Sequence, residues 1–277
     1  MDPDYLATLF DIRGMVVVVT GGGGILGGEI ARGLARAGAR IAILDISVEA
    51  GQTVADAIRD TGGEATAVAC DVLDRDSLLQ ARDQVVARYG RVDALLNGAG
   101  GNRAEATTGP ELSFFDLDAG AFERVLDLNL MGIVLPSQVF GQLMAQQRAG
   151  VILNIASIAG ARPLSRVPAY DAAKGAVVNF TQWLAVHMSA EYSPDIRVNA
   201  IAPGFVLTHQ NRYLLTDPDT GEPTARGRAI VEHTPLGRYG DPAELVGTAL
   251  WLLSPAASFV HGAVIPVDGG FCACAGV

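Results

Sequence analysis

Seven short runs of apolar, largely β-branched residues recur along the chain, and longer amphipathic stretches separate them. Such near-continuously apolar runs are typical of parallel strands that helices cover on both faces. Their alternation with helical stretches predicts an α/β fold, with one doubly wound parallel sheet of seven strands. We expect the strands at residues 15–20, 40–45, 65–70, 92–97, 150–157, 196–202 and 263–268.

The pattern runs through the chain without a repeat, a low-complexity tract or a linker, so we expect a single domain over residues 1–277. The least regular stretch, residues 209–241, is polar, rich in proline and glycine, and follows the sixth expected strand. Long loops of this kind commonly serve as lids. The sequence therefore predicts a substrate lid at about 209–241, built with short helices.

Charge and cysteine usage limit the classes of partner. The net charge is −10 and the pI is about 4.8, whereas nucleic-acid binders carry basic patches. The N-terminus lacks the basic and apolar regions of a signal peptide, and no apolar run approaches membrane-span length. Cys70, Cys272 and Cys274 form no disulfide framework and have no metal-ligand spacing. We expect a cytoplasmic protein with a small-molecule substrate, no metal, and neither nucleic-acid nor membrane partners.

A glycine-rich loop follows the first expected strand. Gly22, Gly24 and Gly27 satisfy G-x-G-x-x-G between a strand and a helix, where the backbone can approach a pyrophosphate at the helix N-terminus. The second strand ends at Asp45, whose carboxylate can accept hydrogen bonds from ribose hydroxyls and repels a 2′-phosphate. No basic residue lies in the loop or at 45–47, which favours NAD over NADP. A helix N-cap is the alternative role of Asp45.

Lys174 is the only lysine in the chain, and it follows Tyr170 by four residues. Residues at this spacing share one face of a helix. An ammonium beside a phenol favours the phenolate and lowers the phenol pKa from about 10. Tyr170 could then exchange a proton with an alcohol or carbonyl near neutral pH. Arginine suits this role less well, since it is a planar fork that does not deprotonate. A solvated helix face is the alternative.

Two further polar residues stand in apolar surroundings. Ser157 ends the fifth expected strand, at the edge where open α/β sheets bind ligands, and its hydroxyl could hold a substrate oxygen. Asn129 lies within an apolar helical stretch, where its amide needs a hydrogen-bond partner. Taken alone, Asn129 is better interpreted as a satisfied structural residue.

Together these residues resemble the short-chain dehydrogenase/reductase family, over nearly the whole chain. The resemblance rests on TGGGGILG (20–27), Asp71-Val72, NGAG (97–100), Asn129, Ser157, Tyr170-x-x-x-Lys174 and PGFVLT (203–208). It implies a Rossmann-like fold, hydride transfer between NAD(H) and a substrate carbon, and a homotetramer or homodimer. One position departs from the family pattern T-G-x-x-x-G-x-G: its sixth residue is Ile25. This leaves the conformation of the loop open.

The resemblance implies a role for each matching residue. Tyr170 would be the general acid/base, and Lys174 would lower its pKa and hold the nicotinamide ribose. Ser157 would stabilise the reacting carbonyl or alkoxide, and Asn129 would anchor a water in a proton relay. The other residues implied to contact the cofactor are Gly21, Gly24, Ile25, Leu26, Asp45, Ile46, Asp71, Val72, Asn97, Ala99, Gly100, Pro203, Gly204, Val206 and Thr208.

Three stretches bear on the substrate: NGAGGNRAEATT (97–108), THQNRYLL (208–215) and the tail GGFCACAGV. They resemble the D-mannonate oxidoreductase (fructuronate reductase) and gluconate 5-dehydrogenase-like branch of the family, which implies a sugar acid. Arg212, or else Arg103, could bind its carboxylate bidentately. Candidates for its hydroxyls are Asn102, His209, Gln210 and Asn211, with Ser157 at the reacting oxygen.

Three alternatives stay open. Loop arginines are often merely solvated. The substrate could instead be another ketone, such as 5-ketogluconate, a 3-oxoacyl thioester or a cyclic ketone. A catalytically silent NAD(H)-sensing protein is the non-enzymatic alternative.

Overall fold

A parallel sheet forms the centre of the computed structural model, which describes residues 3–208, 212, 214–217 and 220–274. Its seven strands follow the order β3-β2-β1-β4-β5-β6-β7, and every neighbouring pair is parallel. The strands are β1 (Val16–Thr20), β2 (Arg40–Asp45), β3 (Glu64–Ala69), β4 (Ala94–Asn97), β5 (Gly150–Ile155), β6 (Ile196–Pro203) and β7 (Val264–Val267). The predicted α/β fold with seven parallel strands is confirmed.

The strand order reverses at the middle of the sheet. From β1 the chain adds β2 and then β3 on one side, and it returns to place β4 on the other side of β1. A crevice opens outside the carboxyl ends of the strands at such a reversal, because the connecting helices leave on opposite faces. The topology therefore positions a ligand site between the ends of β1 and β4.

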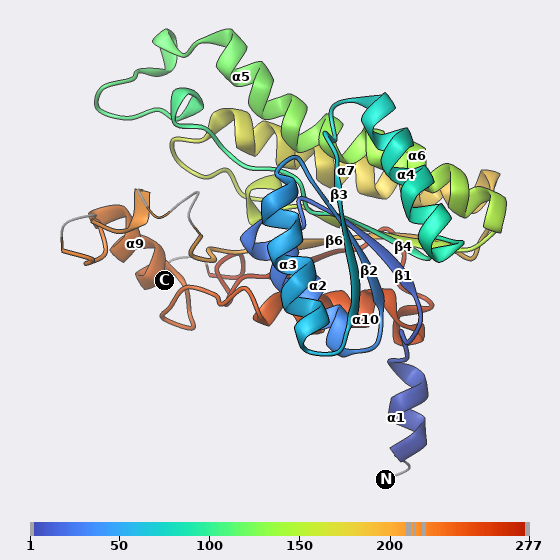
Figure 1. The fold of residues 1–277 in the computed structure, drawn as a ribbon. Coiled ribbons are helices and arrows are strands. Elements are labelled where there is room, and N and C mark those ends of the chain that lie inside the picture. The colour runs from blue at the N-terminus through green and yellow to red at the C-terminus, as the bar shows by residue number, and fades with distance from the viewer. Residues whose placement is uncertain (1–2, 209–211, 213, 218–219, 275–277) are drawn as a thin grey trace.

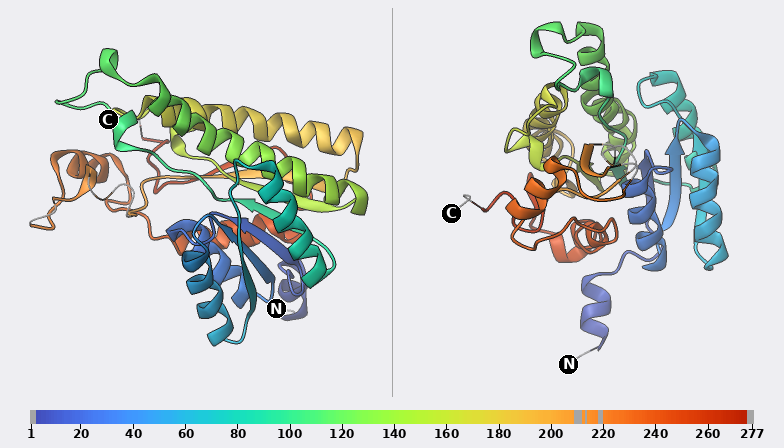
Figure 2. Two further views of the ribbon diagram at one scale, coloured as in Figure 1. Left: turned by 45° about the horizontal axis from the view of Figure 1, so that its top comes forward. Right: turned by 90° about the vertical axis from the view of Figure 1, so that its left-hand side faces the viewer.

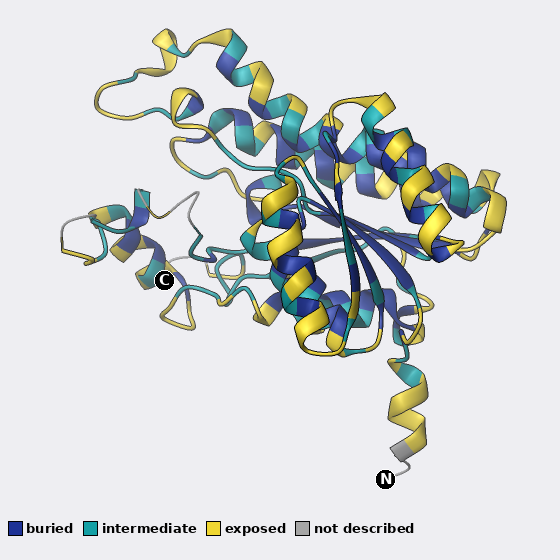
Figure 3. Cartoon of the chain, in the orientation of Figure 1, coloured by how far each residue is buried: buried dark blue, intermediate teal, exposed yellow. Residues whose placement is uncertain are grey.

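Successive residues of the strands pack against opposite layers of helices. Val17 and Val19 face a core shared with α2, α3 and α10, whereas Val16 and Val18 face a core shared with α4, α6 and α7. Figure 1 shows the two layers, and Figure 3 shows the sheet buried between them. The helices are α1 (Pro3–Leu9), α2 (Ile25–Arg36), α3 (Val48–Asp60), α4 (Arg75–Tyr89), α5 (Ala119–Leu126), α6 (Gly132–Gln147), α7 (Pro168–Glu191), α9 (Ala225–His233) and α10 (Glu244–Leu253).

One helical stretch among the described residues, Ala119–Gln147, is long and apolar enough to cross a membrane by length and composition. Half of its most apolar window is buried inside the protein. Its α6 part contributes Val139, Phe140 and Met144 to the core between the sheet and the helices. The stretch therefore serves as a core helix of the α/β domain.

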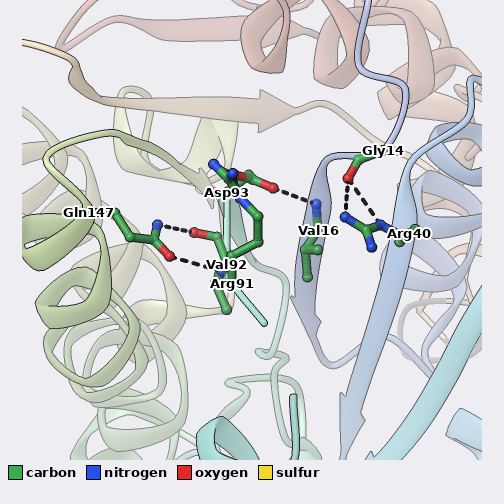
Figure 4. Close-up of polar contacts among 7 residues, drawn as sticks. All are labelled: Gly14, Val16, Arg40, Arg91, Val92, Asp93 and Gln147. Atoms are coloured by element: carbon green, nitrogen blue, oxygen red, sulfur yellow. Dashed lines mark hydrogen bonds and ion pairs between the residues drawn. The ribbon is translucent and has the colours of Figure 1, made fainter. Parts of the chain in front are cut away.

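Polar contacts close the amino ends of the central strands (Figure 4). The Asp93 carboxylate accepts a hydrogen bond of 2.8 Å from the Val16 N–H, at the start of β1. The guanidinium of Arg40 donates to the Gly14 carbonyl, and the side chain of Gln147 bonds both backbone groups of Val92. These contacts satisfy backbone groups that the parallel ladder leaves unpaired at its edge.

The predicted lid region contains one described helix, α9. Thr224 caps its N-terminus, because its hydroxyl accepts a hydrogen bond of 3.0 Å from the Gly227 N–H. The same hydroxyl donates to the Leu214 carbonyl at 2.8 Å, which ties α9 to the segment before it. Figures 1 and 2 show α9 to one side of the sheet, away from α1.

Candidate active site

A cavity of about 640 Å³ lies at the carboxyl ends of the central strands, beside the strand-order reversal. It runs from the glycine loop and the end of β2 to the first turn of α7 and the lid. Most residues predicted to contact cofactor or substrate line it. They are Gly21, Gly24, Ile25, Leu26, Asp45, Ile46, Asp71, Val72, Ala99, Gly100, Asn102, Ser157, Tyr170, Pro203, Gly204, Val206 and Thr208.

The glycine loop leaves no room for side chains at two positions. Gly21 has φ +62°, and a Cβ there would stand 2.7 Å from the Ala99 Cα. A Cβ at Gly27 would collide with the Gly21 carbonyl oxygen. Ile25 is accommodated at the departure from the family pattern because it is the first residue of α2, where a side chain is tolerated. The loop thus presents bare backbone to the cavity, as a phosphate requires.

Asp45 holds the glycine loop against the end of β2. One carboxylate oxygen accepts from the Gly23 N–H at 2.9 Å, and the other from the Ser47 N–H at 3.0 Å. The N-cap of α3 is Ser47, whose hydroxyl accepts from the Ala50 N–H. Asp45 is therefore not the helix cap, and its carboxylate lines the cavity.

Asn97 lies behind the cavity, fully buried, and does not line it. Its amide nitrogen donates to Ser137 Oγ at 3.0 Å and to Asn154 Oδ1 at 2.9 Å. Asn154 donates in turn to Thr181 Oγ1 at 2.9 Å. This buried polar chain joins β4 and β5 to α6 and α7, so Asn97 acts on the site through the placement of the following loop.

Asn129 is fully buried in a single π-helical turn, Asp127–Met131, between α5 and α6. Its amide nitrogen donates to the carbonyls of Gly101 at 2.6 Å and Val125 at 2.8 Å, and its oxygen accepts from the Gly101 N–H at 3.1 Å. Such π-turns widen a helix and are frequent at functional sites. This one lets a helical side chain grip the loop after β4.

Lys174 and Tyr170 share one face of α7, as the sequence predicts. Lys174 is only 3% exposed, so the solvated-face alternative is excluded. Its ammonium donates to the Ile155 carbonyl at 2.8 Å and lies 5.6 Å from the centroid of the Tyr170 ring. Burial lowers the pKa of Lys174 from 10.5 to about 8.

The pKa of Tyr170 is raised, not lowered as expected from its neighbour. Burial of the phenol is the main cause; the Ser157 hydroxyl opposes the shift and Asp171 adds to it. The Lys174 ammonium, 5.6 Å from the ring centroid, does not offset the effect of burial on the phenol.

The predicted substrate residues divide into three groups. Asn102 lines the cavity: its amide nitrogen donates to Thr107 Oγ1 at 2.8 Å, and its buried Oδ1 has no hydrogen-bond partner among the described residues. Arg103 and Arg212 are exposed, and neither lines the cavity. His209, Gln210 and Asn211 lie outside the described residues.

Several cavity residues were missed by reasoning from the sequence. Phe205, Leu214 and Leu215 give the lid side an apolar lining, and Arg226 brings a guanidinium from the first turn of α9. The signal for Arg226 was weak, since it is one of several arginines in the irregular segment. Its position depends on how α9 folds back toward the loop before α7.

The described part of the chain contains no cluster of side chains that could bind a metal ion. No group of three or more His, Cys, Asp or Glu side chains is placed there to hold an ion. The three cysteines are free thiols: Cys70 is buried against the cavity, while Cys272 and Cys274 lie in the C-terminal segment.

Comparison with known proteins identifies the class. The family model described as enoyl-(acyl carrier protein) reductase matches residues 24–272. The chain belongs to the short-chain dehydrogenase/reductase family, and it is an oxidoreductase that acts on CH–OH groups with NAD(P).

Three relatives are similar over almost their full length. An uncharacterised oxidoreductase of Bacillus subtilis, UxuB, is 45% identical over 96% of this chain and 98% of its own. A Haemophilus influenzae structure with bound NAD, provisionally named as a D-mannonate oxidoreductase, is 41% identical, with a TM-score of 0.91 over 98% of this chain and 100% of that one. A Beutenbergia cavernae structure with NADP at low occupancy, provisionally named as a gluconate 5-dehydrogenase, is 36% identical, with a TM-score of 0.84 over 96% and 99%.

Proposed function

We propose that the protein interconverts a secondary alcohol and a ketone on a sugar acid, of the D-mannonate/D-fructuronate type, with NAD(H) as its cofactor. One observation carries the proposal: a single cavity joins the Asp45 carboxylate at one end to Ser157, Tyr170 and the free acceptor of Asn102 at the other. A dinucleotide and a polyhydroxylated substrate both suit this lining. The similarity to the NAD-bound Haemophilus protein supports the same reading.

The residues present fit NAD. Bare backbone at Gly21 and Gly27 suits the pyrophosphate, and the Asp45 carboxylate suits ribose hydroxyls while opposing a 2′-phosphate. Asp71 and Val72 line the cavity beside this adenosine end. When bound, the cofactor supplies the hydride chemistry. The protein's part is to orient the two reacting carbons and to move a proton.

The proton chemistry falls to Tyr170 as general acid/base. Its phenol and the Ser157 hydroxyl interact and both line the cavity, so one substrate oxygen can meet both. In the direction of alcohol oxidation, Tyr170 first gives up its own proton, and its phenolate then takes the hydroxyl proton while Ser157 donates a hydrogen bond to the same oxygen. In ketone reduction, the proton returns to that oxygen.

Lys174 and Asn129 extend this path behind the cavity. Both lie against Gly100: a Cβ built there would stand 2.8 Å from Asn129 Oδ1 and 3.6 Å from Lys174 Nζ. With a pKa of about 8, Lys174 can gain and lose a proton near physiological pH. Lys174 would also hold the nicotinamide ribose, and Asn129 would hold a water that continues the path.

The remaining proposals concern organisation. We propose that the chain works as one domain, in the cytoplasm, with residues 209–241 as the substrate lid and as a homotetramer or homodimer. Trp183, Val186 and Tyr192 are exposed on or just after α7, which supports association through that helix. Sedimentation as a monomer at assay concentration would contradict the oligomer.

One assay tests the function. NADH absorbance is followed with a panel of D-mannonate, D-fructuronate, 5-ketogluconate, a 3-oxoacyl thioester and a cyclic ketone, each with NAD(H) and NADP(H). We expect the highest kcat/KM for the mannonate/fructuronate pair. Preference for 5-ketogluconate would mean that the substrate is a different sugar acid. Preference for an apolar ketone would contradict a sugar acid as substrate. NADH binding without turnover of any compound would favour the sensing alternative.

A further inference from the structure

Among the described residues that line the cavity, Arg226 is the only cation, whereas Asp45 and Asp71 stand at the adenosine end. Lys174 is buried behind the wall and does not line it. The cavity is therefore polarised, with carboxylates where the cofactor's adenosine belongs and a guanidinium at the lid.

Arg226 is held in place by the loop before α7. Its guanidinium donates to the hydroxyl of Ser165, and its Nη2 donates to the Ser165 carbonyl at 3.0 Å. Ser165 precedes the general base Tyr170 by five residues. Its charge acts on the residue that follows Tyr170: Arg226 lowers the pKa of Asp171, against the larger effect of burial. Arg226 thus sits on the lid but faces the catalytic end.

The location is unfavourable for a cation on structural grounds alone. Arg226 lies in the first turn of α9, where the helix dipole disfavours positive charge, and no acidic residue stands in that turn. Arg228, two residues further along α9, is exposed. It donates to the Pro223 carbonyl and so stabilises the start of the helix. The fold nevertheless holds this guanidinium at the cavity wall, where an anionic group of a substrate can meet it.

We propose that Arg226 binds the carboxylate of the substrate, while the buried Oδ1 of Asn102 accepts a hydrogen bond from a substrate hydroxyl. This inference rests on the proposed function and names the group that selects acids over neutral sugars. It assigns to Arg226 the role that the sequence suggested for Arg212 or Arg103, both of which are exposed outside the cavity.

The test compares charge and substrate together. Arg226→Gln keeps a hydrogen-bond donor but removes the charge, and Arg226→Lys keeps the charge but loses the fork. Arg228→Gln is the matched control on the same helix. Each variant is assayed with the sugar acid preferred by the wild type and with its neutral polyol counterpart, which lacks the carboxylate. NADH binding is measured by fluorescence as a readout independent of turnover.

We expect Arg226→Gln to lower kcat/KM for the acid by about tenfold to a hundredfold, mainly through KM, as for a lost charge-assisted hydrogen bond. The polyol and NADH binding should change less than twofold, and Arg228→Gln should match the wild type. Equal losses on acid and polyol, or an unchanged KM for the acid, would overturn the assignment. A selective loss in Arg212→Gln instead would transfer the role to Arg212. A wild type that turns over no sugar acid would defeat the proposed function itself.

Discussion

The amino ends and the carboxyl ends of the parallel strands differ in how their polar groups are hydrogen-bonded; they are called the amino edge and the carboxyl edge below. At the amino edge, Asp93, Arg40 and Gln147 bond backbone groups of the central strands (Figure 4). At the carboxyl edge, three buried side-chain oxygens have no hydrogen-bond partner among the described residues: Oδ1 of Asn97, Asn102 and Asp171. Unpartnered buried acceptors are destabilising. Of these three residues only Asn102 lines the cavity. The amino ends of the strands are therefore built for stability, while the carboxyl ends keep this one acceptor and the bare backbone of the glycine loop for ligands.

Tyr170→Phe should have the largest effect, because it removes the proposed general acid/base at the carboxyl ends of the strands. Turnover should fall by about a hundredfold to ten-thousandfold, with NADH binding retained. The control is Tyr89→Phe, since the Tyr89 hydroxyl donates to the carbonyl of Ile41, near the amino end of β2. Steady-state kinetics on both variants make the comparison. If the two lose activity equally, the functional division between the edges is wrong.

Lys174→Arg comes next, since it keeps a positive charge that cannot be released. Turnover should fall at least about tenfold, because a proton path through this position needs a group that titrates. Wild-type turnover in this variant would mean that the single lysine has no special role.

The pKa of Lys174 also predicts how stability depends on pH. Its folded-state value of about 8 lies below 10.5, so between these values the unfolded chain binds more protons than the folded protein. Wild-type stability should rise with pH across this window, by about 3 kcal/mol relative to Lys174→Met. Urea unfolding of both proteins at pH 7.5, 9 and 10 measures the gain. Parallel curves would show that the lysine is not desolvated in solution.

Asp93→Ala tests the amino edge. It removes the acceptor of the Val16 N–H and the ion pair with Arg91, so the free energy of unfolding should drop by about 1–3 kcal/mol. Turnover at 25 °C should be unchanged, because no residue of the cavity is touched. Asp93→Asn, which keeps an acceptor, should lose less stability. A loss of turnover without a loss of stability would contradict the assignment of this edge.

Asp45→Ser should have the smallest effect, a change in cofactor preference. The variant keeps a short polar group near the Gly23 N–H but removes the charge that opposes a 2′-phosphate. The ratio of kcat/KM for NAD over NADP should fall by about tenfold, equivalent to 1.4 kcal/mol. Asp56→Ser, on the exposed face of α3, is the control for lost charge. An unchanged ratio would place the selection against NADP elsewhere.

The fold was predictable because its signals are local. Strand β2 matches the predicted residues 40–45 throughout. Strand β4 begins at Ala94, two residues later than expected, and both backbone groups of Val92 bond the Gln147 side chain instead of a neighbouring strand. Such edge contacts depend on which strands become neighbours, which a pattern of apolar residues does not specify.

Site residues were predictable where a sequence motif determines their place in the fold. They were missed where tertiary packing alone brings them to the cavity. The glycine loop, Ser157 and Tyr170 line the cavity as expected. Asn97 belongs to the family motif, yet its amide is engaged with Asn154, its partner in the register of β4 with β5. Arg226 reaches the cavity through the packing of α9 against the loop at Ser165, a contact between segments 61 residues apart.

The π-turn at Asp127–Met131 holds one residue more than a turn of α-helix, so α5 and α6 keep nearly the same rotational phase on either side of it. One residue of an α-helix corresponds to about 100° of rotation. A further residue inserted after Asn129 and taken up as α-helix would rotate α5 by roughly that angle relative to α6. Asn129 would then face away from Gly101, and Val125, buried against Ala169 at the start of α7, would face solvent. A one-residue change in helix length would therefore disconnect the loop after β4 from the helix that carries Tyr170, the proposed general base.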